Sequence, residues 1–171
     1  MTPSLPIDHL VDYTDWQRAT WHAWFQNNEA SALAASTGPN GDGRFTTVGA
    51  LVRHIFSAEL RYVERIRGTE LTDAAAIPTT EGAQLFALGA RGRLQLRTLL
   101  ATYRVEAWDT PIDIPLLSKT VRLTPRKILL HVVTHEIRHW AQVATLLRQE
   151  GWKVPPQDLL FSPVYGDPID L

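Results

Sequence analysis

The chain has 171 residues, of which 17 are basic and 18 acidic, a net charge of −1, 44% hydrophobic residues and no cysteine. This size and composition predict one globular domain over residues 1–171, with no general attraction to nucleic acid or to an anionic membrane. The lack of cysteine excludes disulfides, thiolate metal ligands and cysteine nucleophiles, so any bound metal must be held by His, Asp or Glu.

Four segments show the 3.6-residue periodicity of amphipathic helices, with Pro, Gly, Thr and Asp concentrated between them. The expected helices span about residues 6–27, 47–67, 80–104 and 125–150. A threonine cap begins the second, which ends at Gly68, and Thr124 with Pro125 begins the fourth, which Gly151 ends. Gly92 inside the third segment predicts close contact with a neighbouring helix.

Residues 109–123 read DTPIDIPLLSKTVRL and predict a small β-hairpin or an extended connection rather than another helix. After the fourth helix, WKVPPQDLLFSP predicts an extended segment that returns apolar side chains to the body. Together the elements predict an all-α fold, a four-helix bundle with a small β element before the last helix. Because no stretch is apolar enough to span a membrane and no signal peptide is evident, we expect a cytoplasmic protein.

Three of the six histidines, His131, His135 and His139, occupy the fourth segment at spacings of four. These spacings put them within about 80° of arc, and imidazoles at i and i+4 can bind one metal ion. His54 shares the expected buried face of the second segment. Spacing alone leaves open whether these histidines are structural or bind metal, and whether His131 and His135 or His135 and His139 form the ligand pair.

Residues 135–139 also read H-E-x-x-H, the zinc-protease motif in which the glutamate, here Glu136, is the general base. The extended motif requires glycine where this chain has Gln142 and histidine where it has Thr145. Helices rather than a sheet precede the motif. The context disfavours a protease but keeps Glu136 as a base expected beside the histidines.

Two charged groups on the second segment have simpler interpretations. Glu59 lies about 140° from His54 around the helix, which predicts an interhelical salt bridge rather than a second group in the same site. Arg61, Arg65 and Arg67 form a basic edge that we expect to face solvent. Neither feature predicts chemistry by itself.

Four stretches resemble one known family over nearly the whole chain. They are the aromatic-rich DYTDWQRATWHAWF, the histidine-bearing VRHIFSAELRYVERIRG, HVVTHEIRHWAQV with two histidines four apart and a glutamine three further on, and the closing GWKVPPQDLL. The family is the DinB/YfiT-like superfamily of helical-bundle proteins, which includes thiol-dependent transferases and isomerases. The resemblance implies a divalent metal, zinc or nickel, held by His54, His135 and His139. In the family pattern a glutamine follows the second histidine by three residues, and Gln142 in that position selects His135 and His139 over His131 and His135.

The function expected from this resemblance is a metal-dependent enzyme, either a thiol-dependent transferase or a small-molecule hydrolase. Gln142 would then contact a group bound to the metal or orient a ligand. The alternative is a non-catalytic bundle that binds metal or a small ligand as a sensor, a store or a dimer scaffold. The expected partners are a small-molecule substrate, a low-molecular-weight thiol and a second copy of the chain, since six tryptophans and flat helix faces favour a homodimer.

Overall fold

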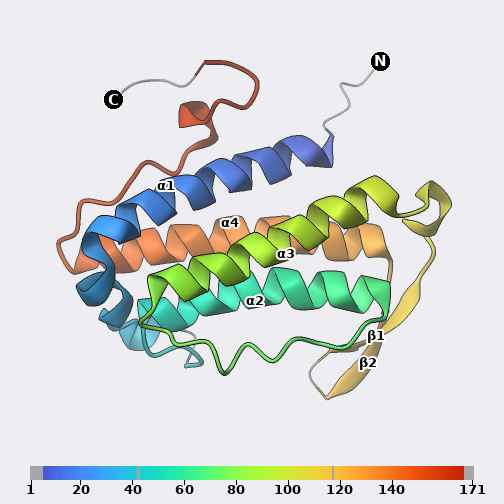
Figure 1. Cartoon of the computed structure of the whole chain (residues 1–171), viewed down its shortest axis with the longest axis horizontal. Helices are drawn as coiled ribbons and strands as arrows, with labels where there is room; N and C mark the ends of the chain where they lie inside the picture. The colour runs from blue at the N-terminus through green and yellow to red at the C-terminus, as the bar shows by residue number, and fades with distance from the viewer. Residues whose placement is uncertain (1–5, 42, 117, 168–171) are drawn as a thin grey trace.

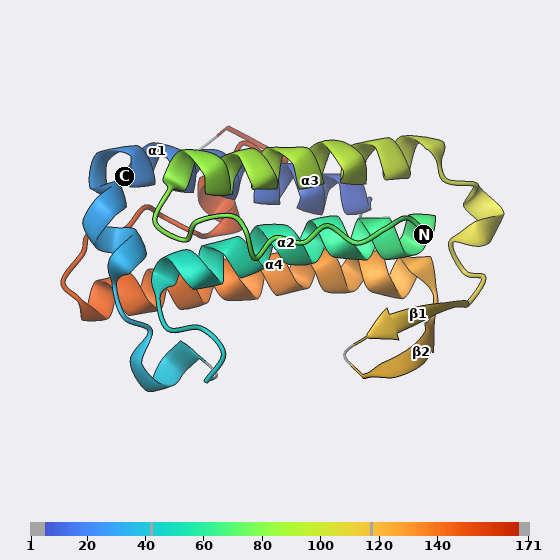
Figure 2. The ribbon, with the colours of Figure 1, turned by 60° about the horizontal axis from the view of Figure 1, so that its bottom comes forward.

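The computed structural model describes residues 6–41, 43–116 and 118–167. Its long helices are α1 (Ile7–Ala34), α2 (Val48–Arg67), α3 (Gly82–Thr102) and α4 (Pro125–Gln149). They lie side by side along the long axis in Figure 1, and Figure 2 shows α1 and α3 in one layer over α2 and α4. The segment 68–81 runs back along α2, so that α2 and α3 point one way and α1 and α4 the other. The predicted four-helix bundle is confirmed.

Capping side chains set the ends of α2 and α4. The Thr47 hydroxyl accepts a hydrogen bond from the Ala50 amide at 3.1 Å, and α2 ends at Gly68, whose φ of 66° is left-handed. Thr124 accepts a hydrogen bond from the Lys127 amide at 3.2 Å at the start of α4. These boundaries agree with the prediction, and α3 is two residues shorter at each end than expected.

The prediction for α1 was wrong at its C-terminal end, because the helix continues from the expected end near residue 27 to Ala34. The added turns include Ala32 and Leu33, which are fully buried in the core. Alanine and leucine have high helix propensity. Burial of these two side chains in the core therefore continues the helix past the polar residues near 27, where the prediction ended it. The loop before α2 is therefore shorter and contains the 3₁₀ turn η1 (Gly38–Gly41).

A two-stranded antiparallel hairpin precedes α4, as expected. Strands β1 (Ile112–Leu116) and β2 (Lys119–Leu123) pair with Ile114 opposite Val121. The 3₁₀ turn η2 (Val105–Ala107) leads from α3 toward it. Ile114 is buried, and β1 contacts α2. The hairpin thus closes over one end of α2.

An aromatic cluster fills one end of the core, where the Trp21 and Trp140 rings stack with their centroids 5.3 Å apart. Glycines in α3 allow this packing: a Cβ atom at Gly89 would lie 2.7 Å from the Phe56 ring, and one at Gly92 would lie 3.3 Å from a Glu59 oxygen. The close contact predicted at Gly92 is confirmed. No helix in the described segments is long and apolar enough to cross a membrane.

The chain after α4 returns along α1, as the sequence predicted. The Trp21 indole donates a hydrogen bond to the Gln157 side chain at 2.8 Å, and the Tyr13 hydroxyl donates to the Gln157 carbonyl. Trp152 and Val154 pack against the aromatic core, and the 3₁₀ turn η3 (Leu159–Phe161) follows. These contacts fasten the tail to the bundle.

Candidate metal centre

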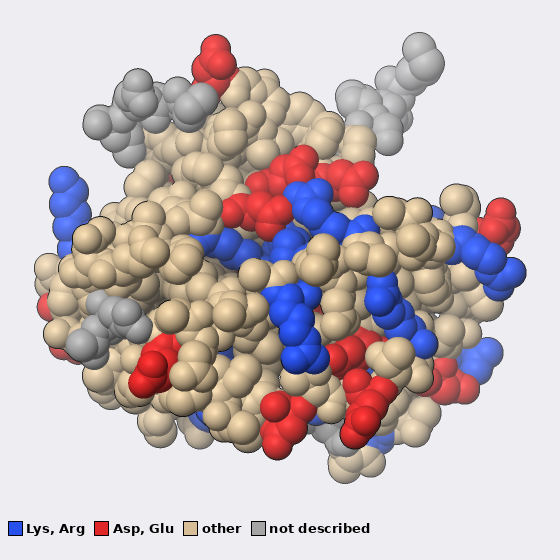
Figure 3. Space-filling view, viewed as in Figure 1, with Lys and Arg blue, Asp and Glu red and all other residues tan. Residues whose placement is uncertain are grey.

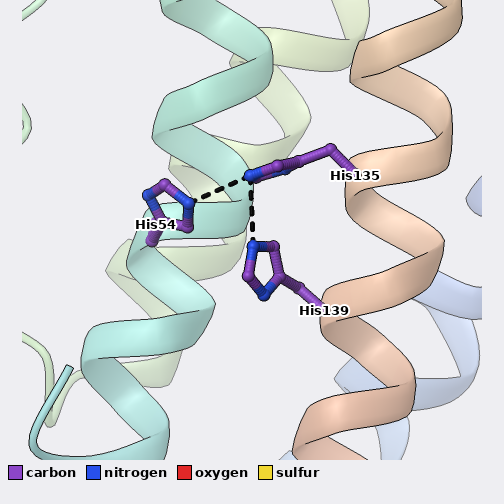
Figure 4. Close-up of side chains that lie close together, drawn as sticks. All are labelled: His54, His135 and His139. Atoms are coloured by element: carbon purple, nitrogen blue, oxygen red, sulfur yellow. Dashed lines mark hydrogen bonds between the residues drawn. The ribbon is translucent and has the colours of Figure 1, made fainter. Parts of the chain in front are cut away.

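Three imidazoles meet between α2 and α4 (Figure 4). His54 projects from α2, and His135 and His139 project from successive turns of α4. The Nε2 atom of His135 lies 3.0 Å from Nε2 of His54 and 3.1 Å from Nε2 of His139. Within the described segments these three residues form a group whose ligand atoms all lie within 4.8 Å of one another. The structure thus brings together the three histidines that the family resemblance selected.

The loop before α2 covers part of this group. The Phe45 ring lies with its centroid 4.6 Å from that of His54 and 6.3 Å from that of His139. A β-bridge between Ser36 and Thr47 holds the two ends of the loop together. Because Phe45 stands in no motif and on no helix face, sequence analysis did not identify it. Its ring shields the imidazoles from water on that side.

A hydrogen bond from Gln142 fixes the orientation of His139, which is fully buried. The Oε1 atom of Gln142 lies 2.8 Å from Nδ1 of His139. An amide oxygen can only accept, so Nδ1 carries the hydrogen and the lone pair on Nε2 faces the other imidazoles. This contact matches the second of the two roles expected for Gln142, the orientation of a ligand, which is a frequent arrangement in metal sites.

Burial and crowding keep two of the imidazoles neutral. Burial, with the neighbouring His139 next in importance, lowers the pKa of His54 to about 4. The same causes, followed by His54, lower the pKa of His135 to about 2. Both values lie far below neutral pH. The side chains therefore present lone pairs, the form that binds metal ions.

The donor set fits a divalent transition metal. Metal–nitrogen bonds of about 2.0–2.1 Å in tetrahedral geometry separate ligand nitrogens by about 3.3 Å. The observed separations of 3.0 and 3.1 Å are close to this value. An all-imidazole set suits zinc, nickel, copper and iron rather than calcium or magnesium. The three histidines can therefore hold the predicted metal with small side-chain movements.

His131 stands outside this group. It lies one turn before His135 on α4, and the two ring centroids are 5.3 Å apart. Its ring packs edge-on against Tyr62 with the centroids 5.2 Å apart. Of the two pairs that spacing left open, the geometry gathers His135 and His139 with His54, and leaves His131 in the wall of the adjacent cavity.

Glu136 points toward α1 and α3, away from the cavity. Its carboxylate accepts hydrogen bonds from Arg18 Nε at 2.5 Å, from Arg93 Nη2 at 2.9 Å and from the Trp140 indole at 3.2 Å. The side chain is 2% exposed. This placement corrects the expectation of an available carboxylate beside the histidines, because both oxygens are bonded to core residues.

Glu59 joins the same buried cluster. Its Oε2 atom lies 2.9 Å from Nη2 of Arg18 and 3.2 Å from Nη2 of Arg93, which confirms the predicted interhelical salt bridge. Burial alone would raise the pKa of Glu136, but Arg18 and Arg93 outweigh burial and lower it. Two carboxylates and two guanidiniums thus balance one another inside the bundle.

A cavity of about 510 Å³ opens beside the imidazoles, with His54 and His135 in its wall. Four arginines line it: Arg44, Arg61, Arg65 and Arg138. Arg61 and Arg67 are exposed, as expected of the basic edge of α2, and Arg65 is partly buried. Arg61 and Arg65 also line the cavity, whereas Arg67 donates to a carbonyl of α3. The sequence contained a signal for their place beside the cavity, because spacings of seven and eleven residues put Arg61 and Arg65 on the same face of the helix as His54.

The face shown in Figure 3 differs from the arginine-lined cavity, because acidic and basic side chains lie next to one another across the middle of the molecule. Outside the cavity, Arg97 of α3 pairs with Asp12 of α1 at 2.6 Å and with Asp15. Among the described residues, no acidic side chain lines the cavity beside the histidines. Among the described residues, the lining of the cavity is therefore basic.

Comparisons with known proteins agree with this architecture. Residues 1–165 match the sequence profile of the DinB family. Protein DinB of Bacillus subtilis is 26% identical over 121 residues, which cover 67% of this chain and 70% of that protein. The crystal structure of a DinB-like protein from Bacillus subtilis has a TM-score of 0.56 at 17% identity and covers 87% of this chain and 96% of its own.

A second crystal structure, of a DinB-like protein from Bacillus cereus, also has a TM-score of 0.56 at 17% identity. It covers 85% of this chain and 94% of its own. At this level of identity the two structures show a shared fold. With a profile match over nearly the whole length, the chain belongs to the DinB family.

Proposed function

We propose that this protein is an enzyme that depends on a divalent metal, zinc or nickel, held by His54, His135 and His139. The observation that carries the proposal is the group of three imidazoles, with ligand atoms within 4.8 Å of one another, beside a cavity of about 510 Å³. Three neutral ligands leave a bound ion its full charge of +2, which lowers the pKa of a thiol or a water molecule next to it.

Of the two reactions expected, we favour transfer of a low-molecular-weight thiol to an electrophilic carbon. The thiol gives its proton to solvent, its sulfur forms a bond to the carbon, and the leaving group departs with its bonding electrons. The sulfur belongs to the substrate, because the chain has no cysteine. Hydrolysis would need a general base, and the contacts of Glu136 with Arg18 and Arg93 speak against that residue.

The alternative is a non-catalytic bundle that binds metal or a small ligand. A site sealed from solvent would favour this alternative. The cavity wall instead includes two of the three histidines, and both are only half-buried. A small molecule can therefore reach them, which supports the catalytic proposal.

Metal-loaded protein should conjugate a fluorogenic alkyl halide with glutathione, bacillithiol or mycothiol. The measured rate should depend on the metal and should be lost in His135→Ala, because that variant removes the central imidazole of the group. If none of the three thiols supports turnover while the protein holds one equivalent of metal, thiol transfer is the wrong reaction.

A pair of matched variants separates thiol transfer from hydrolysis. Glu136→Gln and Glu59→Gln both disturb the same buried ion cluster, but only Glu136 neighbours two of the histidines along the chain. Under thiol transfer the two variants should lower turnover by similar, few-fold factors. A loss on the order of 10²–10⁴ in Glu136→Gln alone would indicate a general base and hence hydrolysis.

We further propose that the protein acts in the cytoplasm as a homodimer. Trp21 and Trp140 are fully buried in the core of the single chain, so these two rings do not support a dimer. The proposal rests on the general preference of protein oligomers for self-complementary pairs. Sedimentation at micromolar concentration should give twice the chain mass of 19.2 kDa. A single species at the chain mass would contradict the dimer.

A further inference from the structure

Three arginines of the cavity differ in their partners from most arginines elsewhere in the protein. Most arginines on other surfaces and in the core contact a carboxylate: Arg18, Arg91, Arg93, Arg97, Arg122 and Arg126. Within the described segments, Arg61, Arg65 and Arg138 have no carboxylate partner, and no acidic residue lines the cavity that they share. No described carboxylate therefore forms an ion pair with these three guanidiniums.

All three arginines are aligned with the histidines by helix periodicity. Arg61 and Arg65 follow His54 by seven and eleven residues on α2, and Arg138 follows His135 by three on α4. Arg65 is held in place by two contacts. Its Nε donates a hydrogen bond to the Pro115 carbonyl of β1 at 2.8 Å, and its guanidinium carbon lies 5.2 Å from the centroid of the Tyr62 ring. Burial, followed by the like charge of Arg61, lowers the pKa of Arg65.

Arg138 contacts the histidine group itself. Its Nη2 atom lies 3.1 Å from Nε2 of His139, and because a guanidinium only donates, the imidazole lone pair accepts this bond. A metal ion would claim the same lone pair. The guanidinium would then need another acceptor close to the histidines, and in the part of the chain that the structure describes no carboxylate lines the cavity to serve as one.

We propose that the cavity binds a small organic anion whose carboxylate or phosphate group is held by Arg61, Arg65 and Arg138. Planar guanidiniums match the paired oxygens of these groups, and a volume of about 510 Å³ suits a small molecule. Apolar side chains provide room for a short aliphatic body: Ala58, Leu71 and Leu116. If the protein is the enzyme proposed above, this anion is its substrate, so the role of the cavity in catalysis rests on the proposed function.

Calorimetric titration of the metal-free and the zinc-loaded protein with succinate and with inorganic phosphate tests this proposal. Both should bind, and succinamide, which has the same carbon skeleton without charge, should not. Arg61→Gln and Arg138→Gln should each weaken anion binding by about tenfold or more through loss of a charge-assisted hydrogen bond. Arg126→Gln is the matched control, because it removes the same charge from an arginine paired with Asp109 outside the cavity.

The result that supports the proposal is weaker binding in the two cavity variants and unchanged binding in the control. Preference for succinate over phosphate, or the reverse, identifies the anionic group. Equal affinities in Arg61→Gln and Arg126→Gln, or no binding of either anion by protein that takes up one equivalent of zinc, would overturn it. If the protein binds an anion but no zinc, the anion site is supported and the proposed metal-dependent enzyme is not. The experiment therefore distinguishes failure of the anion site from failure of the proposed function.

Discussion

Helices α2 and α4 each contribute to two clusters of polar side chains, and the two clusters are built on different principles. Toward α1 and α3, Glu59 and Glu136 meet Arg18 and Arg93, and the charges cancel inside the core. On the cavity side, neutral imidazoles lie beside Arg61, Arg65 and Arg138, which contact no carboxylate within the described segments. The charged groups of the first cluster pair with one another, whereas we propose that bound ions complete the second.

The largest expected effect comes from breaking the balanced cluster. Glu136→Ala leaves Arg18 and Arg93 with one buried carboxylate between them, and loss of one partner of a buried ion pair costs about 3–5 kcal/mol. Urea unfolding should show this loss, while the folded variant still binds metal with unchanged stoichiometry. Glu150→Ala, at the exposed end of α4, is the control. A destabilisation below about 1 kcal/mol would contradict a structural role.

The second cluster should respond in metal affinity rather than in stability. Gln142→Ala removes the acceptor that orients His139, and loss of such a partner weakens metal binding by about 10–100-fold. Competition with a chromogenic chelator measures the change. Thr145→Ala, on the exposed side of the same helix, should leave affinity unaltered. Equal affinities in the two variants would show that the hydrogen bond does not support the site.

Acid should destabilise the metal-free protein through the second cluster. The pKa values of His54 and His135 are lowered to about 4 and about 2, below the imidazole value of about 6.5 in the unfolded chain. The unfolded chain therefore binds more protons, so the stability present above about pH 6.5 falls as the pH approaches 4. Thermal midpoints between pH 7.5 and 4.5 should fall more steeply for the wild type than for the double variant His54→Gln, His135→Gln.

Identical pH slopes for these two proteins would contradict the neutral state of the imidazoles. Other titrating groups are present in both proteins and cancel in the comparison. The difference in slope therefore reports on the two replaced histidines alone.

The smallest expected effect concerns surface charge. Arg97 pairs with Asp12 and Asp15, but its side chain is 43% exposed, and exposed ion pairs contribute less than about 1 kcal/mol. Arg97→Gln should shift the urea midpoint only slightly and leave metal binding unchanged. A loss comparable to that of Glu136→Ala would show that burial does not distinguish the core cluster from the surface pairs.

Local signals in the sequence predicted most of the architecture. The Thr47 and Thr124 caps, Gly68 and the helical periodicity located the helix ends, and the proline-containing segment before α4 formed the expected hairpin. Helical spacing together with family resemblance selected His54, His135 and His139. These features depend on neighbours in the sequence or on one repeated pattern.

The remaining features depend on contacts between distant segments. Nothing near Glu136 in the sequence indicates that Arg18 and Arg93 would reach it from two other helices. Arg61 and Arg65 share the face of His54, but only the return of the hairpin over α2 turns that face into a cavity wall. The end of α1 was likewise set by burial in the core rather than by a local stop signal.

Metal stoichiometry tests the central claim most directly. Untagged protein reconstituted with zinc or nickel and then dialysed should retain about one equivalent by elemental analysis, and so should His131→Ala, whose imidazole stands outside the group. The variants His54→Ala, His135→Ala and His139→Ala should each retain far less. Failure of the wild type to retain either metal, or equal losses in all four variants, would contradict the three-histidine site.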